Sequence, residues 1–361
     1  MKQTEENLLA LLRPEVQAMN AYRVPESLGL IKLDAMENPY AWPDKMKQEW
    51  LQLMSEAEPN RYPDPAAKQL VSQLRTSFGV DSALGLVLGN GSDELIQLVL
   101  MALCEGSVVM APTPTFVMYQ HVAHSLGLVF TGVPLQNDFS LDVTSMLKVI
   151  ERDRPAVIFL AYPNNPTANL FSEQDVVQII EAAPGLVIVD EAYQPFAKKS
   201  FLEAVIKYPQ LLVMRTVSKL GLAGLRLGYL VGTKSMTDQL EKIRLPYNIN
   251  IFTQLTARFA FDHSEVLQQQ AEQLCEQREQ MLKRLADLKG LSVFPSDANF
   301  ILFSLVSAKA AQIFAALKEA GVLVKNMTGV EGLPAQCLRV TVGTESQNKL
   351  FMDALENILK S

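Results

Sequence analysis

The segment TVSKLGLAGLRLGYL (216–230) contains only two charged residues, Lys219 and Arg226, among leucines, glycines and one alanine. A lysine in such apolar surroundings is rarely buried unless it is paired or takes part in chemistry. Desolvation and neighbouring cations lower the pKa of a lysine, and the neutral amine is a nucleophile toward carbonyl groups. Arg226 keeps its charge, and its planar fork matches a phosphate. The pair therefore suits a ligand that carries both an aldehyde and a phosphate.

Asp190 ends the apolar run GLVIVD (185–190), so we expect its carboxylate to have little contact with water. Such a carboxylate is costly unless a cation or several hydrogen-bond donors meet it. A protonated ring nitrogen would meet that need, and an ordinary ion pair is the alternative. Tyr193 follows three residues later, and its hydroxyl could reach the same ligand.

The turn GNGSDEL (89–95) precedes a helical pattern, and Ser92 can cap that helix. The amides of a first helical turn have no partner within the helix, and with the helix dipole they favour anions. Asp93 would contribute its amide, because its carboxylate repels a phosphate. Taken alone, a tight turn with acidic residues is the simpler interpretation of this segment.

Phe116 and the segment YPNNPTAN (162–169) follow two further apolar runs. An aromatic ring there stacks on a planar ligand or simply joins the core, and taken alone the core is the simpler interpretation. Asn164 and Asn165, held between two prolines, offer amide donors and acceptors or form a plain turn. Together, groups for an aldehyde, a phosphate, a ring nitrogen and a ring face describe pyridoxal phosphate.

Short β-branched apolar runs, separated by helical patterns, are the elements that position these residues. Uninterrupted runs of this kind are typical of parallel strands that are covered on both faces. The runs are SVVMA (107–111), PAVIFLA (155–161), GLVIVD (185–190) and LLVMRT (211–216). Helical segments at 92–106 and 172–185 fit the crossovers between strands. The sequence thus predicts an α/β sheet whose ligand lies beyond the carboxyl ends of its strands.

The last part of the chain predicts a small α+β unit. Its expected elements are strands in 291–305, 321–326 and 336–343 and a helix at 307–320. A long helical pattern from about Phe252 to Lys289 would connect this unit to the sheet. The segment before about Asp44 has little regular pattern, and we interpret it as an arm and a piece of the small unit. We expect an arm at 1–45, a large cofactor-binding domain at 46–250, and a connecting helix with a small domain at 251–361.

The composition is that of an ordinary soluble globular protein, with 361 residues, 48% hydrophobic and 20% charged. A net charge of −7 gives no electrostatic case for nucleic acid or an anionic membrane. The three cysteines have no CxxC spacing, which argues against disulfides and zinc, and we expect no metal. No apolar stretch reaches the roughly 18 residues of a membrane span, and the first residues lack a signal-peptide pattern. We therefore expect a cytoplasmic protein.

The segment SKLGLAGLRLGY (218–229) resembles the cofactor-lysine motif of the fold type I aminotransferases, and the NNPT, VDEAY and GNGSDE segments resemble further motifs of that family. More narrowly, four segments resemble the histidinol-phosphate aminotransferases: MENPY (36–40), RYPD (61–64), PSDANFILF (295–303) and LRVTVGT (338–344). The resemblance extends from about residue 22 to about residue 350. It implies a three-layer α/β/α large domain with a mostly parallel sheet plus a small α+β domain, with pyridoxal 5'-phosphate as cofactor.

The resemblance also implies roles for individual residues. The implied catalytic residues are Lys219, which forms the internal aldimine and carries the proton, Asp190 at the ring nitrogen, and Tyr193. Further cofactor contacts are Asn165 and Phe116 at the ring, and Ser92, Asp93, Ser218 and Arg226 at the phosphate. Tyr62 is similar to the tyrosine that reaches this phosphate from the second subunit, which implies a homodimer with shared active sites. The implied substrate contacts are Arg339, which grips the anionic group, with Lys325, Tyr22 and Asn38.

The chain departs from the family pattern at three positions. Ala168 follows NNPT where relatives usually have glycine. Phe116 replaces the commoner tyrosine, which leaves stacking intact but removes a hydroxyl. Lys325 stands where arginine is common, and this exchanges a fork for a point charge.

The expected reaction converts L-histidinol phosphate and 2-oxoglutarate to imidazole acetol phosphate and L-glutamate in histidine biosynthesis. An aromatic amino-acid aminotransferase would use Arg339 for a carboxylate, and a threonine-phosphate decarboxylase shares much of the framework. A cofactor-binding regulatory protein is disfavoured because the chain has no basic segment for DNA.

Overall fold

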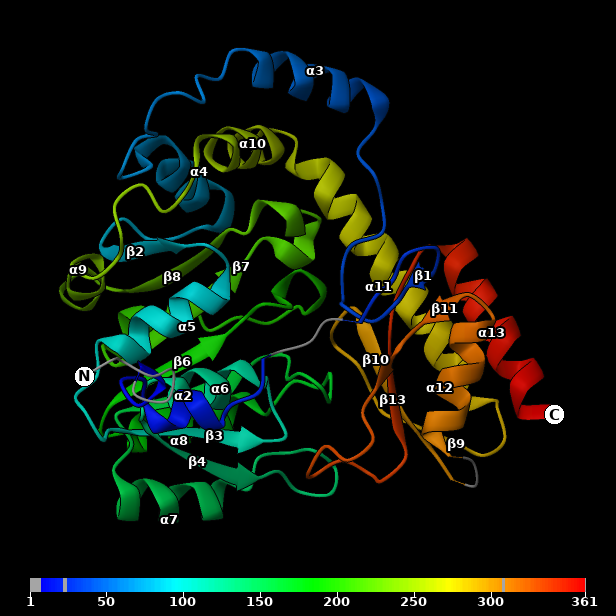
Figure 1. Ribbon diagram of the computed structural model, residues 1–361. Coiled ribbons are helices and arrows are strands. Elements are labelled where there is room, and N and C mark those ends of the chain that lie inside the picture. Colours follow the sequence, from blue (N-terminus) through cyan, green and yellow to red (C-terminus); the bar gives the residue numbers. More distant parts are fainter. Residues whose placement is uncertain (1–7, 22–24, 307–308, 361) are drawn as a thin grey trace.

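The computed structural model describes residues 8–21, 25–306 and 309–360. Two units, each built around a β-sheet, lie side by side, and the chain passes between them along one long helix (Figure 1). None of the helices in the described residues is long and apolar enough to cross a membrane.

The larger unit contains a seven-stranded sheet with the strand order β2-β8-β7-β6-β5-β3-β4. Only β8 is antiparallel to its neighbours, so the sheet is mostly parallel and the predicted fold class is confirmed. The strands are β2 (Leu84–Gly89), β3 (Val108–Thr113), β4 (Val129–Pro134), β5 (Val157–Ala161), β6 (Leu186–Asp190), β7 (Leu211–Thr216) and β8 (Gly228–Thr233).

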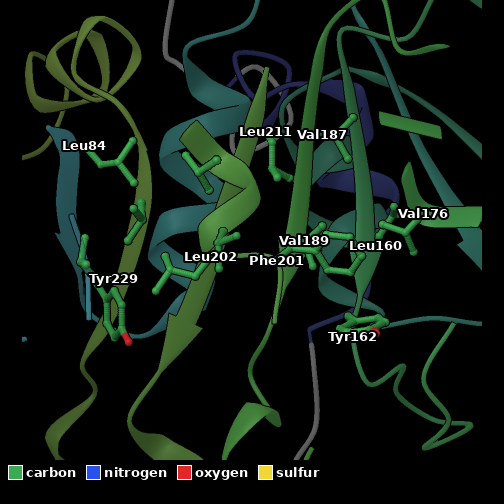
Figure 2. Packing of buried hydrophobic residues seen from close by; sticks show 14 of the residues in the cluster. Leu84, Leu160, Tyr162, Val176, Val187, Val189, Phe201, Leu202, Leu211 and Tyr229 are labelled. Atoms are coloured by element: carbon green, nitrogen blue, oxygen red, sulfur yellow. The ribbon is translucent and has the colours of Figure 1, made fainter. Parts of the chain in front are cut away.

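Helices cover both faces of this sheet, which explains why its strands are apolar without alternation. Along β5, Ile158 and Leu160 belong to the buried cluster on one face, while Val157 and Phe159 belong to the cluster on the other. The first cluster, part of which is drawn in Figure 2, packs against α4 (Lys68–Phe78), α7 (Val143–Asp153), α8 (Glu173–Ala182) and α10 (Ile251–Asp262). The second packs against α5 (Ser92–Met101), α6 (Met118–Ser125) and α9 (Lys234–Glu241). Three layers result, as expected.

The smaller unit has a four-stranded antiparallel sheet with the order β12-β13-β10-β9. Its strands are β9 (Leu291–Val293), β10 (Phe300–Leu305), β12 (Lys325–Asn326) and β13 (Cys337–Thr341), and its helices are α11 (Ser264–Ala286), α12 (Ala310–Glu319) and α13 (Glu345–Lys360). The segment 321–326 contains two short strands, because β11 (Val322–Leu323) pairs instead with β1 (Ile31–Lys32). Part of the N-terminal segment is therefore joined to the small unit.

The helical pattern predicted from 252 to 289 forms two helices, because the backbone of His263 leaves the helical region (φ −117°, ψ 34°). Helix α10 packs on α4 and on α3 (Asp44–Ser55). Ala257 and Phe261 of α10 belong to the core of the large sheet, whereas Leu274 and Met281 of α11 belong to the core of the small unit. The predicted boundary between 250 and 251 stays a prediction, and this packing favours placing α10 with the large unit.

The remaining elements are short. They are α2 (Pro14–Ala18) and four 3-10 turns, η1 (Gln194–Phe196), η2 (Glu203–Ile206), η3 (Ser218–Leu220) and η4 (Ala223–Leu225). Helix α5 ends at Met101 and is shorter than the predicted 92–106.

Candidate active site

The carboxyl ends of β5, β6 and β7 meet at one edge of the large sheet, where polar residues follow each strand. A cavity of about 110 Å³ lies there. The predicted site residues that line it are Ser92, Asp93, Phe116, Asn165, Asp190, Tyr193, Ser218, Lys219 and Arg226. The structure thus brings together residues from five separate segments, as expected for a ligand beyond the carboxyl ends of parallel strands.

Asp190 is the last residue of β6 and is only 4% exposed. Its Oδ2 accepts a 2.6 Å hydrogen bond from the hydroxyl of Tyr119, and its Oδ1 accepts a 3.1 Å bond from the amide of Ala192. Burial raises the pKa of Asp190 to about 6, and these two donors act against the rise. The sequence analysis did not identify Tyr119, because nothing in the residues around it indicates a contact with Asp190.

Lys219 lies in the turn after β7, and its Nζ donates a 3.0 Å hydrogen bond to the carbonyl of Ala35. The same nitrogen lies 5.8 Å from the centroid of the Tyr193 ring. Burial, assisted by the charge of Arg339, lowers the pKa of Lys219 from 10.5 to about 8. A lysine in this environment exists partly as a neutral amine near neutral pH.

The start of α5 lies at one end of the cavity. No side chain caps this helix, so the amides of its first turn are free for a ligand. Arg226 extends over the turn, and its Nη2 donates a 3.1 Å bond to Oδ2 of Asp93. Gly91 has a φ of 82°, which strains any other residue, and a Cβ there would lie 2.7 Å from that Nη2 and displace the end of the arginine. The carboxylate of Asp93 therefore orients Arg226, and only its amide is suited to an anion.

Ser218 completes this end of the cavity through a partner that the sequence analysis missed. The hydroxyl of Thr216, at the end of β7, lies 2.9 Å from the Ser218 hydroxyl and 3.2 Å from the Ser218 amide. Both residues are buried. The contact fixes the orientation of the serine hydroxyl.

A chain of hydrogen bonds leads from the ring of Tyr193 toward the small unit. The Nδ2 of Asn165 donates a 3.2 Å bond to the Tyr193 hydroxyl. Nη1 of Arg339 donates to Oδ1 of Asn165, and Nη2 donates a 3.2 Å bond to the carbonyl of Asp34. Arg339 therefore contacts the residues around the first cavity directly.

A second cavity of about 530 Å³ adjoins the first and shares Met36, Phe116 and Asn165 with it. Arg339 and Lys325 both line its wall. These residues lie directly opposite each other on the antiparallel strands β13 and β12. Opposed residues point to the same face of a sheet, so the two positive charges are held close together.

The loop 162–169 separates the two cavities and is held by buried contacts. Asn164 is fully buried, and its amide bonds the carbonyl of Pro114 at 2.9 Å and the hydroxyl of Thr167 at 2.7 Å. Ala168 has the left-handed φ of 68° that favours glycine. Its backbone amide donates a 2.8 Å hydrogen bond to the carbonyl of Asn164, and its carbonyl accepts a 2.8 Å hydrogen bond from the amide of Asp297. Asn164 therefore builds the turn, while Asn165 faces the cavities.

Glu191, in the segment VDEAY, forms a buried ion pair beneath the site. Nε of Arg215 donates a 2.8 Å bond to its Oε2, and the hydroxyl of Ser200 donates a 2.9 Å bond to the same oxygen. This pair ties the end of β6 to β7. Glu191 has a structural role, in contrast to its neighbour Asp190.

Two predicted residues, Tyr62 and Asn38, line neither of these cavities. The side chain of Tyr62 is 81% exposed and stacks on Tyr247 with centroids 4.5 Å apart. Asn38 donates a 3.0 Å bond to Gln270 and lines a third cavity of about 610 Å³, which shares Ser218 with the first. Tyr22 lies outside the described residues. Their roles in binding stay predictions.

The donor set fits pyridoxal 5'-phosphate. Free helix amides with Arg226 and Ser218 suit its phosphate, the buried carboxylate of Asp190 suits a ring nitrogen, and the amine of Lys219 suits its aldehyde. Within the described ranges, no group of three or more histidine, cysteine, aspartate or glutamate side chains is arranged to hold a metal ion.

Comparison with known proteins agrees with this fit. Residues 29–355 match the family model described as aminotransferase class I and II. The chain is 52% identical over 354 residues to histidinol-phosphate aminotransferase 2 of Nitrosococcus oceani, with 98% of each chain covered. It is 47% identical over 350 residues to histidinol-phosphate aminotransferase 2 of Cupriavidus pinatubonensis, with 95% of each covered.

A solved structure shares the fold. It is that of histidinol-phosphate aminotransferase from Sinorhizobium meliloti in complex with pyridoxal-5'-phosphate, with a TM-score of 0.86 and 24% identity. The match covers 96% of this chain and 97% of that one. The likeness therefore extends over both units.

Proposed function

The chain belongs to the class I and II aminotransferases, and we propose that it transfers the amino group of L-histidinol phosphate to 2-oxoglutarate, giving imidazole acetol phosphate and L-glutamate in histidine biosynthesis. The observation that supports this substrate is the pair of cations, Lys325 and Arg339, in the wall of the 530 Å³ cavity. A phosphate monoester carries about two negative charges at neutral pH and matches two cations, whereas a carboxylate carries one.

Pyridoxal 5'-phosphate is the cofactor, and when bound it supplies an electron sink for the negative charge that develops at the substrate's α carbon. Arg226, the hydroxyl of Ser218 and the amides of Ser92 and Asp93 hold the phosphate. Phe116 contacts the ring, and Tyr193 and Asn165 provide hydrogen bonds at its oxygen.

Asp190 keeps the ring nitrogen protonated. Its carboxylate is 4% exposed, so an adjacent positive charge satisfies a group that would otherwise be costly to ionise.

Lys219 acts as the base. Its amine has a pKa lowered to about 8, so a substantial fraction is neutral near neutral pH and can accept the proton that leaves the substrate carbon at Nζ. The same amine returns the proton later in the reaction.

We also propose a cytoplasmic homodimer in which Tyr62 reaches the phosphate of the second subunit. Its exposed ring, supported by Tyr247, is available to a second copy of the chain. Leu245 and Phe252 are also exposed, 72% and 45%, and would be covered by an interface. Light scattering of the purified protein tests the dimer, and a monomer that retains full activity would contradict the shared site.

Separate half-reactions test the proposed function. Histidinol phosphate alone should convert the bound cofactor from its aldehyde to its amine form, which is visible in the absorption spectrum. Subsequent addition of 2-oxoglutarate should restore the first spectrum and release glutamate, as ping-pong kinetics require. A holoenzyme that is converted by other amines and not by histidinol phosphate would contradict the assigned substrate.

A further inference from the structure

The hydroxyl of Tyr119 contacts the one side chain that faces the ring nitrogen of the proposed cofactor. It donates a 2.6 Å hydrogen bond to Oδ2 of Asp190. Tyr119 does not line either cavity of the site, and its hydroxyl acts on the site through the aspartate. The other oxygen of Asp190 is bonded to the amide of Ala192. Each carboxylate oxygen thus has its own donor.

The ring of Tyr119 is fixed in place by its neighbours. It is fully buried, stacks on Phe159 of β5 with centroids 4.4 Å apart, and meets the edge of Phe116 at 5.6 Å. Burial also raises the pKa of the Tyr119 hydroxyl, so this group stays protonated and can only donate toward Asp190. The direction of the hydrogen bond is therefore defined.

The carboxylate needs this donor because its surroundings oppose its charge. Burial raises its pKa, and the negative charges of Asp93 on α5 and of the adjacent Glu191 raise it further. The Tyr119 hydroxyl and the Ala192 amide act in the opposite direction. A hydrogen bond stabilises a charged carboxylate more than it stabilises a neutral carboxylic acid. Loss of the hydroxyl therefore favours the protonated acid.

We propose that Tyr119 is a positioning residue for cofactor activation: its hydroxyl holds the Asp190 carboxylate ionised and oriented, so that the proton stays on the ring nitrogen. This inference rests on the proposed function, since it requires a cofactor with a pyridine ring. Without the hydroxyl, a proton shared between Asp190 and the ring nitrogen would reside on Asp190. No atom is gained or lost.

A simple packing role for Tyr119 makes a different prediction. Phenylalanine keeps the ring and its stacking on Phe159, so Tyr119→Phe removes the hydroxyl alone. Tyr208→Phe is a matched control, because the Tyr208 hydroxyl also donates to a carboxylate, that of Glu181, at 2.9 Å. Tyr208 lies just before the start of β7, at the end of the strand away from the site. Both changes delete one tyrosine-carboxylate bond.

The decisive experiment uses pyridoxamine 5'-phosphate labelled with 15N in the ring, which binds without covalent attachment to Lys219. In the unmodified protein and in Tyr208→Phe, we expect the 15N chemical shift of a protonated ring nitrogen. In Tyr119→Phe, the shift should move toward the unprotonated value, and kcat should fall about 10-fold to 100-fold. An unchanged shift in Tyr119→Phe would overturn the inference.

A second measurement needs no cofactor and remains informative if Tyr119→Phe binds it weakly. Infrared titration of the cofactor-free protein follows the Asp190 carboxyl, with Asp190→Asn identifying its band. We expect a midpoint at about 6 in the unmodified protein and a clearly higher midpoint in Tyr119→Phe. Equal midpoints would overturn the inference, as would an equal shift in Tyr208→Phe.

The outcomes distinguish this inference from the proposed function. An unmodified protein that fails to bind pyridoxamine 5'-phosphate would contradict both. A protein that binds it with a protonated nitrogen in every variant would contradict only the role of Tyr119. A double variant with Asp190→Asn should show no further 15N shift from Tyr119→Phe, because the coupled partner is absent.

Discussion

The two adjoining cavities of the site are built in different ways. The smaller one, about 110 Å³, lies at strand ends of a single sheet, and its polar side chains bond one another or nearby backbone groups. The larger one, about 530 Å³, is enclosed between the loop 113–117 of the large unit and β12 and β13 of the small unit. The sheet thus fixes the residues proposed to act on the cofactor, while the junction between units shapes the space proposed for the substrate.

This difference has an energetic consequence. Asp190 and Ser218 are buried and depend on particular partners, so removing one partner leaves a buried polar group unsatisfied. Lys325 is only half-buried, and its loss removes a charge without exposing such a group. Changes in the small cavity should therefore impair chemistry, and changes in the large cavity should impair selection of the substrate.

The largest expected effect is that of Lys219→Ala. Loss of the base should lower turnover about 1000-fold or more, because the proton on the substrate carbon has no acceptor. Borohydride reduction followed by mass spectrometry should find cofactor on the peptide with residue 219 in the unmodified protein only. The exposed Lys47 provides a control, since Lys47→Ala should change neither result. Cofactor fixed at another lysine of the active Lys47→Ala protein would contradict the assignment.

A smaller and more selective effect is expected for Lys325→Ala. The KM for histidinol phosphate should rise about 10-fold to 100-fold, the usual cost of a hydrogen bond to a charged group. The kcat and the affinity for pyridoxamine 5'-phosphate should stay within about threefold of those of the unmodified protein, because the Lys325 side chain shares no partner with the residues of the small cavity in the described part of the chain. Lys325→Arg should restore the low KM through its bidentate fork. An equal loss of cofactor affinity would remove the distinction between the cavities.

A change of pH should affect the small cavity in a defined direction. The pKa of Lys219 is lowered from 10.5 to about 8, so its contribution to folding stability is present above 10.5 and is lost as the pH falls through about 8. The rate of cofactor attachment to the cofactor-free protein should rise roughly tenfold from about pH 7 to about pH 9, as the neutral amine appears. Arg339→Ala should move this profile to higher pH, because Arg339 helps to lower the pKa. A flat profile would contradict the assigned base.

The smallest effect is expected for Ala168→Gly in the loop between the cavities. Glycine relieves the strain of the left-handed backbone, which stabilises the folded protein by about 1 kcal/mol. The loss of a buried methyl group and the greater flexibility of the unfolded chain act against this gain in stability. Urea unfolding should therefore show a change below about 1 kcal/mol, with turnover unaffected. A several-fold loss of turnover would show that the loop geometry depends on this methyl group.

Much of the large unit could be predicted from its sequence. Runs such as GLVIVD and LLVMRT are buried on both faces, and the polar residues that follow them necessarily meet at one edge. That rule placed Asp190 and Lys219 together. Strands β2, β4 and β8 were not among the predicted runs, and the apolar residues of β8 do not reveal that it is antiparallel.

The contacts that tune the site were beyond the sequence. Tyr119 reaches Asp190 only because α6 packs against β5, and nothing local to either segment indicates that packing. The juxtaposition of Lys325 and Arg339 depends on the register of two strands separated by a loop. Neither proline nor glycine marks the break between α10 and α11 at His263. The helical pattern in the sequence therefore continues through the break and does not predict it.

The most direct test of the account is a side-by-side measurement of kcat/KM for histidinol phosphate, phenylalanine and threonine phosphate, with release of carbon dioxide monitored in each case. Two cations in the larger cavity predict that histidinol phosphate is preferred over phenylalanine by at least about 100-fold, the value of one charged contact or more. The proposed function, a transamination, also predicts that no carbon dioxide is released. A preference for phenylalanine, or decarboxylation of threonine phosphate at a higher kcat/KM, would contradict the proposed function.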